Sequence, residues 1–412
     1  MDTTHYDVIV IGGGAAGFFA AIQCKNLDKN LAVGILEKSN HVLAKVKVSG
    51  GGRCNVTHHM PEVKQLLTHY PRGQKELHSP FTNFNILHTI EWFESKGVKL
   101  KIEPDGRMFP VTNSSQTIID CLLNEISKYK IPVMFNCDVL EITKAENKFR
   151  IVCRDERTFT CSKLIVATGG FNKASSYDFI AKTGVRIVAP VPSLFSFKIQ
   201  NSPFKDLPGS VIQNALVTIV HTKQSMQGPL LITHEGMSGP AILKLSALAA
   251  RELYECQYVF SIRINALPMQ KQDPLRQKLN EMKIIHAQKK VGNTPLSELT
   301  SRLWNRYCEL SNISPEDVWQ SVSKKDINVL CEKLQNLAVD VNGKSLNKEE
   351  FVTCGGVDLK QINLQRMEHK QIPNLFFAGE IMNVDGVTGG FNFQHAWTSG
   401  YIAACGAAGG GE

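Results

Sequence analysis

The sequence lacks the features that mark membrane-spanning, secreted or metal-binding chains. It has no run of 18 apolar residues, so it predicts no membrane-spanning helix. Its 11 cysteines include no Cys-x-x-Cys pair, which argues against a zinc site and against a thioredoxin-like dithiol. The apolar stretch 8–22 follows acidic rather than basic residues and is interrupted by glycines, unlike a signal peptide. We therefore expect a cytoplasmic protein that binds no metal.

Charge of one sign is not concentrated in any block of the chain. The 46 lysines and arginines exceed the 38 aspartates and glutamates by 8. Such a mild excess fits an anionic cofactor as well as a nucleic acid, and by itself it identifies neither. With 412 residues, of which 43% are hydrophobic and 20% charged, the chain is long enough for two or three globular domains.

A glycine-rich turn near the N-terminus is the clearest motif. Residues 6–11 predict a buried strand, 15–27 a helix and 31–36 a second buried strand, which together form a strand-helix-strand unit. The segment Gly12-Gly13-Gly14-Ala15-Ala16-Gly17 lies between the first strand and the helix and fits G-x-G-x-x-G. Here Gly12 permits a tight turn, Gly14 permits close approach of a pyrophosphate, and Gly17 lets the helix and the strand pack closely.

An acidic residue stands where the dinucleotide fingerprint requires one. Glu37 ends the second strand, about 20 residues after Gly17. Its carboxylate accepts hydrogen bonds from ribose hydroxyls, and its charge repels a 2′-phosphate. The N-terminus of the first helix adds unpaired N–H groups and partial positive charge for the phosphates. These features predict a Rossmann-type dinucleotide site, without distinguishing FAD from NAD.

Three further glycine-containing segments favour FAD. Ser49-Gly50-Gly51-Gly52-Arg53-Cys54-Asn55 follows the second strand, and its successive N–H groups predict an anion-binding nest. We interpret Arg53 and Asn55 as ligands of the pyrophosphate or of the pyrimidine edge of the flavin. In the second segment, Ala167-Thr168-Gly169-Gly170, glycine at the end of a buried strand permits close passage of a dinucleotide.

The third segment lies near the C-terminus. A buried strand at 375–378 leads into Gly379 and Glu380, and the glycine-rich stretch 385–390 leads into a closing helix at 391–404. We expect Glu380 or Asp385 to bind ribitol hydroxyls. The N-terminus of the closing helix is expected to face the N1–C2=O edge of the flavin. There the helix dipole favours negative charge and hydride acceptance at N5.

The middle of the chain predicts other elements and further domains. A hairpin is expected within 97–110, a helix capped by Ser114, and a β-meander at 138–160. The sequence therefore predicts an α/β protein whose Rossmann-type FAD-binding domain, a parallel sheet plus the β-meander, comprises residues 1–190 and 350–412. A β-rich substrate domain is expected at 191–268 and 338–349. Residues 269–337 predict a helical domain.

Five segments resemble the YhiN-like flavoprotein family, which includes bile-acid-inducible N-type reductases. They are GGGAAG, SGGGRCNVT, ATGG, THEGMSGP and AGEIMNVDGVTGGFNFQHAWTSG, and the resemblance covers essentially the whole chain. It implies an FAD domain, an inserted β-barrel-like domain and a helical domain. It also implies FAD contacts at Gly12, Gly14, Gly17, Glu37, Arg53, Cys54, Asn55, Val139, Glu380, Asn392 and Phe393. Neighbours of these residues complete the candidate cofactor site: Ala15, Ala16, Lys38, Ser49, Gly50, Gly51, Gly52, Ala167, Thr168, Gly169, Gly379, Asp385 and Gly390.

The rest of the sequence indicates which electron donor and which proton donor the flavin uses. No second G-x-G-x-x-G module occurs between residues 170 and 375, so NADH or NADPH has to reach the flavin as a diffusible donor, or another donor serves. The loop 233–240 is the candidate substrate-facing segment, and its His234 is the candidate acid or base near pH 7. Cys54 and His395 are interpreted as packed, structural side chains.

Three functional hypotheses remain open. The first is an FAD-dependent oxidoreductase that transfers hydride through flavin N5 between NAD(P)H, or another donor, and a small or steroid-like carbonyl or enone substrate. The second is an oxidase of amines or aminoketones that passes electrons to O₂. The third is a flavoprotein that acts on tRNA through its lysine-rich segment 270–338. A small molecule is the expected partner, rather than a nucleic acid.

Overall fold

The computed structural model describes residues 4–345 and 352–409. The chain divides into two compact units, one formed by Met1–Pro192 with Lys348–Glu412 and the other by Ser193–Asn347. The finer division into three domains stays a prediction. Within the described ranges, none of the helices combines the length and the apolar composition that a membrane span requires.

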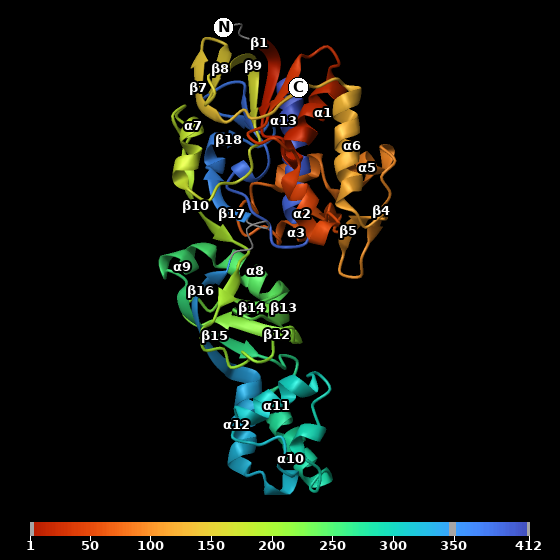
Figure 1. Cartoon of the computed structure of the whole chain (residues 1–412), viewed down its shortest axis with the longest axis vertical. Coiled ribbons are helices and arrows are strands. Elements are labelled where there is room, and N and C mark those ends of the chain that lie inside the picture. Colours follow the sequence, from red (N-terminus) through yellow and green to blue (C-terminus); the bar gives the residue numbers. More distant parts are fainter. Residues whose placement is uncertain (1–3, 346–351, 410–412) are drawn as a thin grey trace. The chain divides into compact units, whose positions relative to one another are not determined.

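A sheet built from both ends of the chain forms the centre of the first unit (Figure 1). β1 (Thr4–Ile11) lies between β2 (Val33–Leu36) and β9 (Thr158–Val166) and runs parallel to both. β20 (Leu375–Phe377), from the C-terminal part, adds to the other side of β9, also in parallel. The remaining strands of the sheet are β6 (Val133–Met134), β7 (Val139–Ala145), β8 (Lys148–Cys153), β18 (Ile362–Asn363) and β19 (Glu368–His369). The Rossmann-type fold with its β-meander, β7 to β9, is thereby confirmed.

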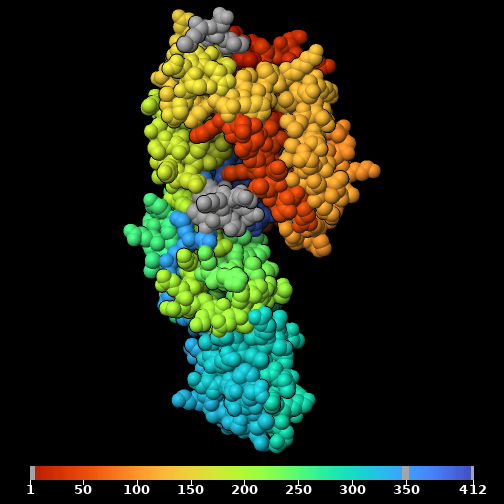
Figure 2. Space-filling view, in the orientation of Figure 1, coloured from red at the N-terminus to blue at the C-terminus, as the bar shows by residue number. Residues whose placement is uncertain are grey.

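The two helices that pack against each other beside this sheet are α1 (Ala15–Leu27) and α13 (Phe391–Ala408), which Figure 1 draws in red and blue. Their approach depends on small residues, because a Cβ atom at Gly400 would stand 2.9 Å from the carbonyl oxygen of Ala16. Phe19 and Trp397, both fully buried, meet with ring centroids 5.4 Å apart. Burial of each such side chain contributes about 1.5–3 kcal/mol to stability. Figure 2 likewise shows blue C-terminal residues between red N-terminal residues and yellow-green residues of the middle of the chain.

Shorter elements complete the first unit. α6 (Ser115–Lys128) is capped as predicted, since the Ser114 hydroxyl accepts a hydrogen bond from Gln116 N at 3.3 Å. The predicted hairpin is formed by β4 (Leu100–Ile102) and β5 (Arg107–Pro110), which pair antiparallel. The helices are α2 (Ala44–Gly52), α3 (Val63–Leu67), α4 (His78–Asn83), α5 (Ile86–Ser95), α6 (Ser115–Lys128), η1 (Ala174–Tyr177), α7 (Asp178–Ala181), η4 (Leu359–Gln361) and η5 (Gly379–Ile381). The strands are β3 (Thr57–His58), β4 (Leu100–Ile102), β5 (Arg107–Pro110), β10 (Ile187–Ser193) and β17 (Val352–Val357).

The second unit is a closed barrel with helices packed on it. The six antiparallel strands are β11 (Ser196–Lys198), β12 (Val211–Ile219), β13 (Ser225–Ile232), β14 (Gly236–Ser238), β15 (Val259–Asn265) and β16 (Leu337–Ser345). Alternate residues of β16, Leu337, Val339 and Val341, point into the core. The helices are α8 (Pro240–Leu248), α9 (Ala250–Glu255), α10 (Gln272–Ile285), η2 (Val291–Asn293), α11 (Ser301–Glu309), η3 (Trp319–Ser321) and α12 (Lys324–Asn336). α10 to α12 share one hydrophobic core with the barrel.

Candidate cofactor site

The three motif glycines of the turn between β1 and α1 serve two purposes. Gly12 has a φ of 113°, and a Cβ atom there would stand 2.4 Å from the carbonyl oxygen of Ala167. A Cβ atom at Gly17 would stand 1.9 Å from the carbonyl oxygen of Gly12. A Cβ atom at Gly14 would meet nothing within 4 Å, so the space beside Gly14 is open. Gly12 and Gly17 therefore serve backbone packing, whereas Gly14 leaves room in front of the helix N-terminus.

Glu37 stands beside this turn at the end of β2. Its Oε2 accepts a hydrogen bond from Gly13 N at 2.7 Å, and its Oε1 accepts from Ser39 N at 2.8 Å. Lys38 is exposed and pairs with Asp138 at 3.3 Å, one residue before Val139 begins β7. The carboxylate of Glu37 is thus fixed against the glycine turn, where the sequence predicts a ribose.

Glu380 stands on the other side of the same turn. Its Oε1 accepts from Thr353 N at 2.8 Å, and its Oε2 lies 2.7 Å from Lys45 Nζ. A Cβ atom at Gly379 would lie 2.8 Å from Ala16 Cβ, so the end of β20 touches the start of α1. Because neighbouring strands lie about 4.8 Å apart, the strands that carry Glu37 and Glu380 are separated by about 14 Å across β1 and β9.

Other predicted residues lie at the end of β9, the strand between β1 and β20. Ala167, Thr168 and Gly169 follow β9, and Gly169 has a φ of 76°. A Cβ atom at Gly170 would stand 2.4 Å from Thr353 Oγ1. That hydroxyl is buried and has no hydrogen-bond partner among the described residues. Lys45 and Thr353 belong to no recognisable motif, so the sequence gives no signal for either of them.

The second glycine run forms the end of α2 rather than a free loop. The helix breaks at Ser49, and Gly50 and Gly51 take φ values of 58° and 68°. The guanidinium of Arg53 pairs with Glu103 at 2.6 Å and lies 4.0 Å from the ring centroid of Phe109. Arg53 is therefore held by the β4–β5 hairpin.

Cys54 and Asn55 follow, and both are buried. Burial raises the pKa of the Cys54 thiol to about 12, so the side chain is a packed thiol. Asn55 is only 8% exposed, and its Oδ1 has no hydrogen-bond partner among the described residues. A Cβ atom at Gly390 would stand 2.9 Å from this oxygen, so Asn55 Oδ1 adjoins the residue that precedes α13.

The N-terminus of α13 is held in place by its own side chains. Asn392 Oδ1 accepts from Gly386 N at 2.7 Å and Asn392 Nδ2 donates to Gly386 O at 2.9 Å, which closes the loop before the helix. Phe393 stacks on Trp397 with ring centroids 5.8 Å apart. The N–H groups of the first helical turn lack partners within the helix. They form a row of donors beside the unpaired acceptor of Asn55.

Asp385 does not occupy the position that its predicted role as a ribitol ligand requires. Its side chain is completely buried, and both carboxylate oxygens accept hydrogen bonds from the guanidinium of Arg72. The expectation that this carboxylate faces ribitol is therefore not met, and Glu380 is the carboxylate at the open edge of the sheet. Sequence reasoning missed Arg72, because no spacing links residues that are 313 positions apart.

His395, one turn into α13, is fully enclosed. Its Nε2 lies 3.3 Å from the carbonyl oxygen of Gly379. Burial lowers the pKa of His395 from 6.5 to about 4, so the ring is neutral near pH 7. Unlike the buried His395, His234 is exposed to solvent, on a bend between β13 and β14 in the second unit.

We expect the free energy of unfolding to decrease below pH 6.5 because of His395. The folded protein keeps this ring neutral down to about pH 4, whereas the unfolded chain takes up a proton. The contribution of His395 to the free energy of unfolding is therefore complete above pH 6.5. As the pH falls from 6.5 towards 4, this contribution decreases by about 1.4 kcal/mol per pH unit. Urea unfolding at about pH 7 and about pH 5 measures this slope, which should be shallower in His395→Gln. Identical slopes in both proteins would show that His395 is not responsible.

Comparisons with known proteins bear on this arrangement. The model of the HI0933-like protein Rossmann domain family matches residues 6–406. The chain is 29% identical to the ribosomal RNA dihydrouridine synthase of Escherichia coli, over 97% of each chain. It is 27% identical to the 3-dehydro-bile acid delta(4,6)-reductase of Clostridium scindens, over 97% of this chain and 98% of the relative.

The family match confirms the resemblance that the sequence motifs indicated. The fold is also found in a solved flavoenzyme structure. A 3-ketosteroid-delta4-(5alpha)-dehydrogenase from Rhodococcus jostii is similar with a TM-score of 0.50 and 12% identity, covering 98% of this chain and 97% of that one. The chain belongs to the HI0933-like Rossmann-domain family and is an FAD-dependent oxidoreductase.

Proposed function

We propose that this protein holds FAD across the ends of β2, β1, β9 and β20 and reduces a carbon–carbon double bond conjugated to a carbonyl group. The observation that carries the proposal is the unpaired Asn55 Oδ1 beside the donor row of α13. An acceptor next to donors matches the pyrimidine edge of a flavin, which offers an N3–H group next to the C2=O group. A buried acceptor left without a partner costs about 1–3 kcal/mol, so a ligand that satisfies it is favoured.

The remaining residues are assigned along the extended cofactor. Glu37 receives the ribose hydroxyls, and the open face at Gly14 with the N-terminus of α1 receives the pyrophosphate. Glu380, whose carboxylate Lys45 and Thr353 hold, receives the ribitol hydroxyls. Bound FAD supplies hydride transfer through its N5 atom. The dipole of α13 stabilises negative charge at the pyrimidine edge, which favours the reduced cofactor.

The substrate class is inferred from the chemistry that the two relatives' names share. One name describes dihydrouridine formation in ribosomal RNA and the other describes reduction at delta(4,6) of a 3-dehydro-bile acid. In both cases the double bond lies in a ring and is conjugated to a carbonyl group. We propose a small or steroid-like enone as the substrate and NADH or NADPH as the donor. We assign the proton transfer to His234, on the exposed bend between β13 and β14.

A uridine in RNA is the second candidate substrate. Residues 193–347 contain 18 lysines and arginines against 13 aspartates and glutamates, so most of the excess positive charge lies in the second unit. Positive charge of this kind supports non-specific attraction to a phosphate backbone. The relative named for ribosomal RNA is also similar over 97% of its length.

Anaerobic spectroscopy of the FAD-loaded protein tests the reaction and separates the candidates. NADH or NADPH is expected to bleach the visible flavin band, and a cyclic enone such as 4-androstene-3,17-dione is expected to restore it stoichiometrically. Restoration by a uridine-containing RNA alone would select the second candidate. Restoration only by air, with formation of hydrogen peroxide, would identify an oxidase and refute the proposal. His234→Asn should slow restoration by the substrate and leave bleaching by the donor unchanged.

A further inference from the structure

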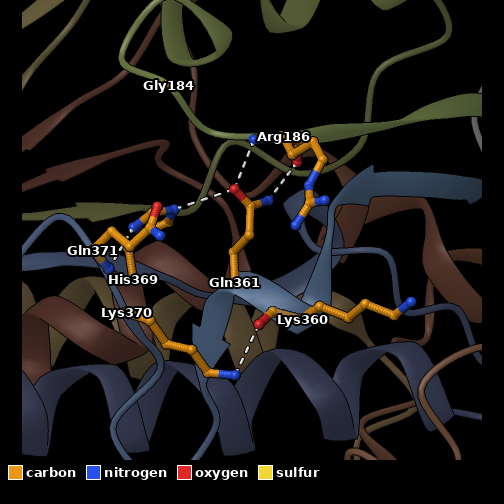
Figure 3. Close-up of a pocket in the computed structure, with 7 residues that line it drawn as sticks. All are labelled: Gly184, Arg186, Lys360, Gln361, His369, Lys370 and Gln371. Atoms are coloured by element: carbon orange, nitrogen blue, oxygen red, sulfur yellow. Dashed lines mark hydrogen bonds between the residues drawn. The ribbon is translucent and has the colours of Figure 1, made fainter.

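The first unit contains a hollow that the cofactor site does not use. It has a volume of about 390 Å³, within the range of small-molecule sites. It is lined by Gly184, Arg186, Lys360, Gln361, His369, Lys370 and Gln371, as Figure 3 shows. Its residue His369 lies at the opposite end of β20 from Gly379 and Glu380 of the cofactor site. β20 runs towards Gly379, and the antiparallel β19 places His369 near the start of β20.

The polar walls of the hollow are fixed by hydrogen bonds of their own. The side-chain amide of Gln361 bonds the backbone of Arg186 twice, accepting from its N at 2.9 Å and donating to its O at 2.9 Å (Figure 3). His369 Nδ1 accepts from Gln371 N at 3.2 Å and from Ile372 N at 3.0 Å. The walls are therefore formed before any ligand arrives, which lowers the entropic cost of binding.

The histidine in this wall is a neutral structural group. Its Nδ1 accepts two N–H groups and so carries no proton, while its Nε2 lies 3.4 Å from Gln361 Oε1. Burial also lowers the pKa of His369. The charge of the hollow therefore comes from its other residues.

Three cationic side chains supply that charge, and none of the described residues that line the hollow carries a carboxylate side chain. Arg186 Nε lies 3.4 Å from Asp358 Oδ2, but this arginine side chain is 68% exposed, and such exposed pairs contribute only about 0–1 kcal/mol. The ammonium group of Lys370 is held by a hydrogen bond, because its Nζ donates to the carbonyl oxygen of Lys360 at 2.8 Å. Arg186, Lys360 and Lys370 carry three positive charges and Asp358 carries one negative charge, so the net charge of these four side chains is +2.

We propose that this hollow binds a phosphate group, carried either by a free nucleotide or by the backbone of a nucleic acid. A guanidinium and two ammonium groups match the charge and the oxygen acceptors of a phosphate, and an arginine can bind two of these oxygens at once. Such a site extends the proposed function, since it holds a ligand or a substrate at a point remote from the flavin.

The decisive comparison uses FAD-loaded protein with Lys360→Gln and Lys370→Gln combined. Both lysines are exposed, so we expect the melting temperature and the flavin spectrum to stay unchanged. The matched control combines Lys64→Gln and Lys148→Gln, two exposed lysines elsewhere in the same unit. The probes are inorganic pyrophosphate, ADP and a fluorescent single-stranded RNA. Binding is measured by equilibrium dialysis for the first two and by anisotropy for the RNA.

We expect at least one probe to bind about tenfold or more weakly to the hollow variant and equally well to the control variant. Loss of ADP and pyrophosphate binding would assign the site to a free nucleotide. Loss of RNA binding alone, with the salt slope reduced by about 1.4 for two charges on a single strand, would assign it to a nucleic-acid backbone. The proposal is refuted if no probe binds the wild-type protein, or if both variants bind every probe as the wild type does.

Discussion

Gly14→Ala is expected to weaken FAD binding about 100-fold or more while the protein without cofactor stays folded. A Cβ atom at this position meets no protein atom within 4 Å, and the backbone has an ordinary φ of −90°. The added methyl group therefore costs the apoprotein little. It occupies the space in front of the α1 N-terminus that we assign to the pyrophosphate. A 100-fold loss corresponds to about 2.7 kcal/mol of binding free energy.

Gly17→Ala supplies the matched control, because it changes the same motif in the opposite way. Its Cβ atom would stand 1.9 Å from the carbonyl oxygen of Gly12, so backbone has to move. Overpacking of this kind costs about 1–3 kcal/mol or more before any ligand is added. Thermal melting of both variants with and without FAD separates the two effects. Gly14→Ala should keep its apoprotein melting temperature and lose the increase caused by FAD, whereas Gly17→Ala should lose both. An undiminished increase in Gly14→Ala would place the pyrophosphate elsewhere.

The parts of the fold that the sequence predicts well are those encoded by neighbouring residues. The strand-helix-strand unit at 6–36 combines a buried β-branched run, a glycine turn and a helix within one short segment. Ser114 caps α6 through a residue two positions away, and the hairpin at 97–110 is set by its own turn. Each of these elements is determined locally, so that periodicity and turn residues are sufficient to find it.

The candidate site is less predictable, because its side chains are held by partners distant in sequence. Arg53 and Glu103 are 50 positions apart, and Lys45 and Glu380 are 335 positions apart. A charged residue in a glycine-rich loop has the same sequence signature whether it faces a ligand or a buried counter-charge. For this reason Asp385 and Glu380 were equivalent ribitol candidates in the sequence. Only the fold distinguishes them, since it buries Asp385 against Arg72 and leaves Glu380 at the sheet edge.

Asp385→Asn is expected to lower the free energy of unfolding by about 3–5 kcal/mol, since it leaves the charge of Arg72 buried without its counter-charge. Both oxygens of this carboxylate are used, its side chain is 0% exposed, and that of Arg72 is 16% exposed. The pair joins the segment after α3 to the loop that leads into α13, where the two residues also form a β-bridge. Urea unfolding of the apoprotein, compared between wild type and variant, measures the loss.

The double variant Arg72→Met with Asp385→Leu separates the charge from the packing. Replacing a buried ion pair by apolar side chains of similar volume is often neutral or stabilising, so we expect the double variant to recover most of the stability. Its affinity for FAD then reports what the pair does beyond stability. If the ion pair fixes the loop that positions the α13 donor row, the double variant folds normally but binds FAD more weakly than the wild type. Equal instability of the single and double variants would show that shape, rather than charge, makes this contact necessary.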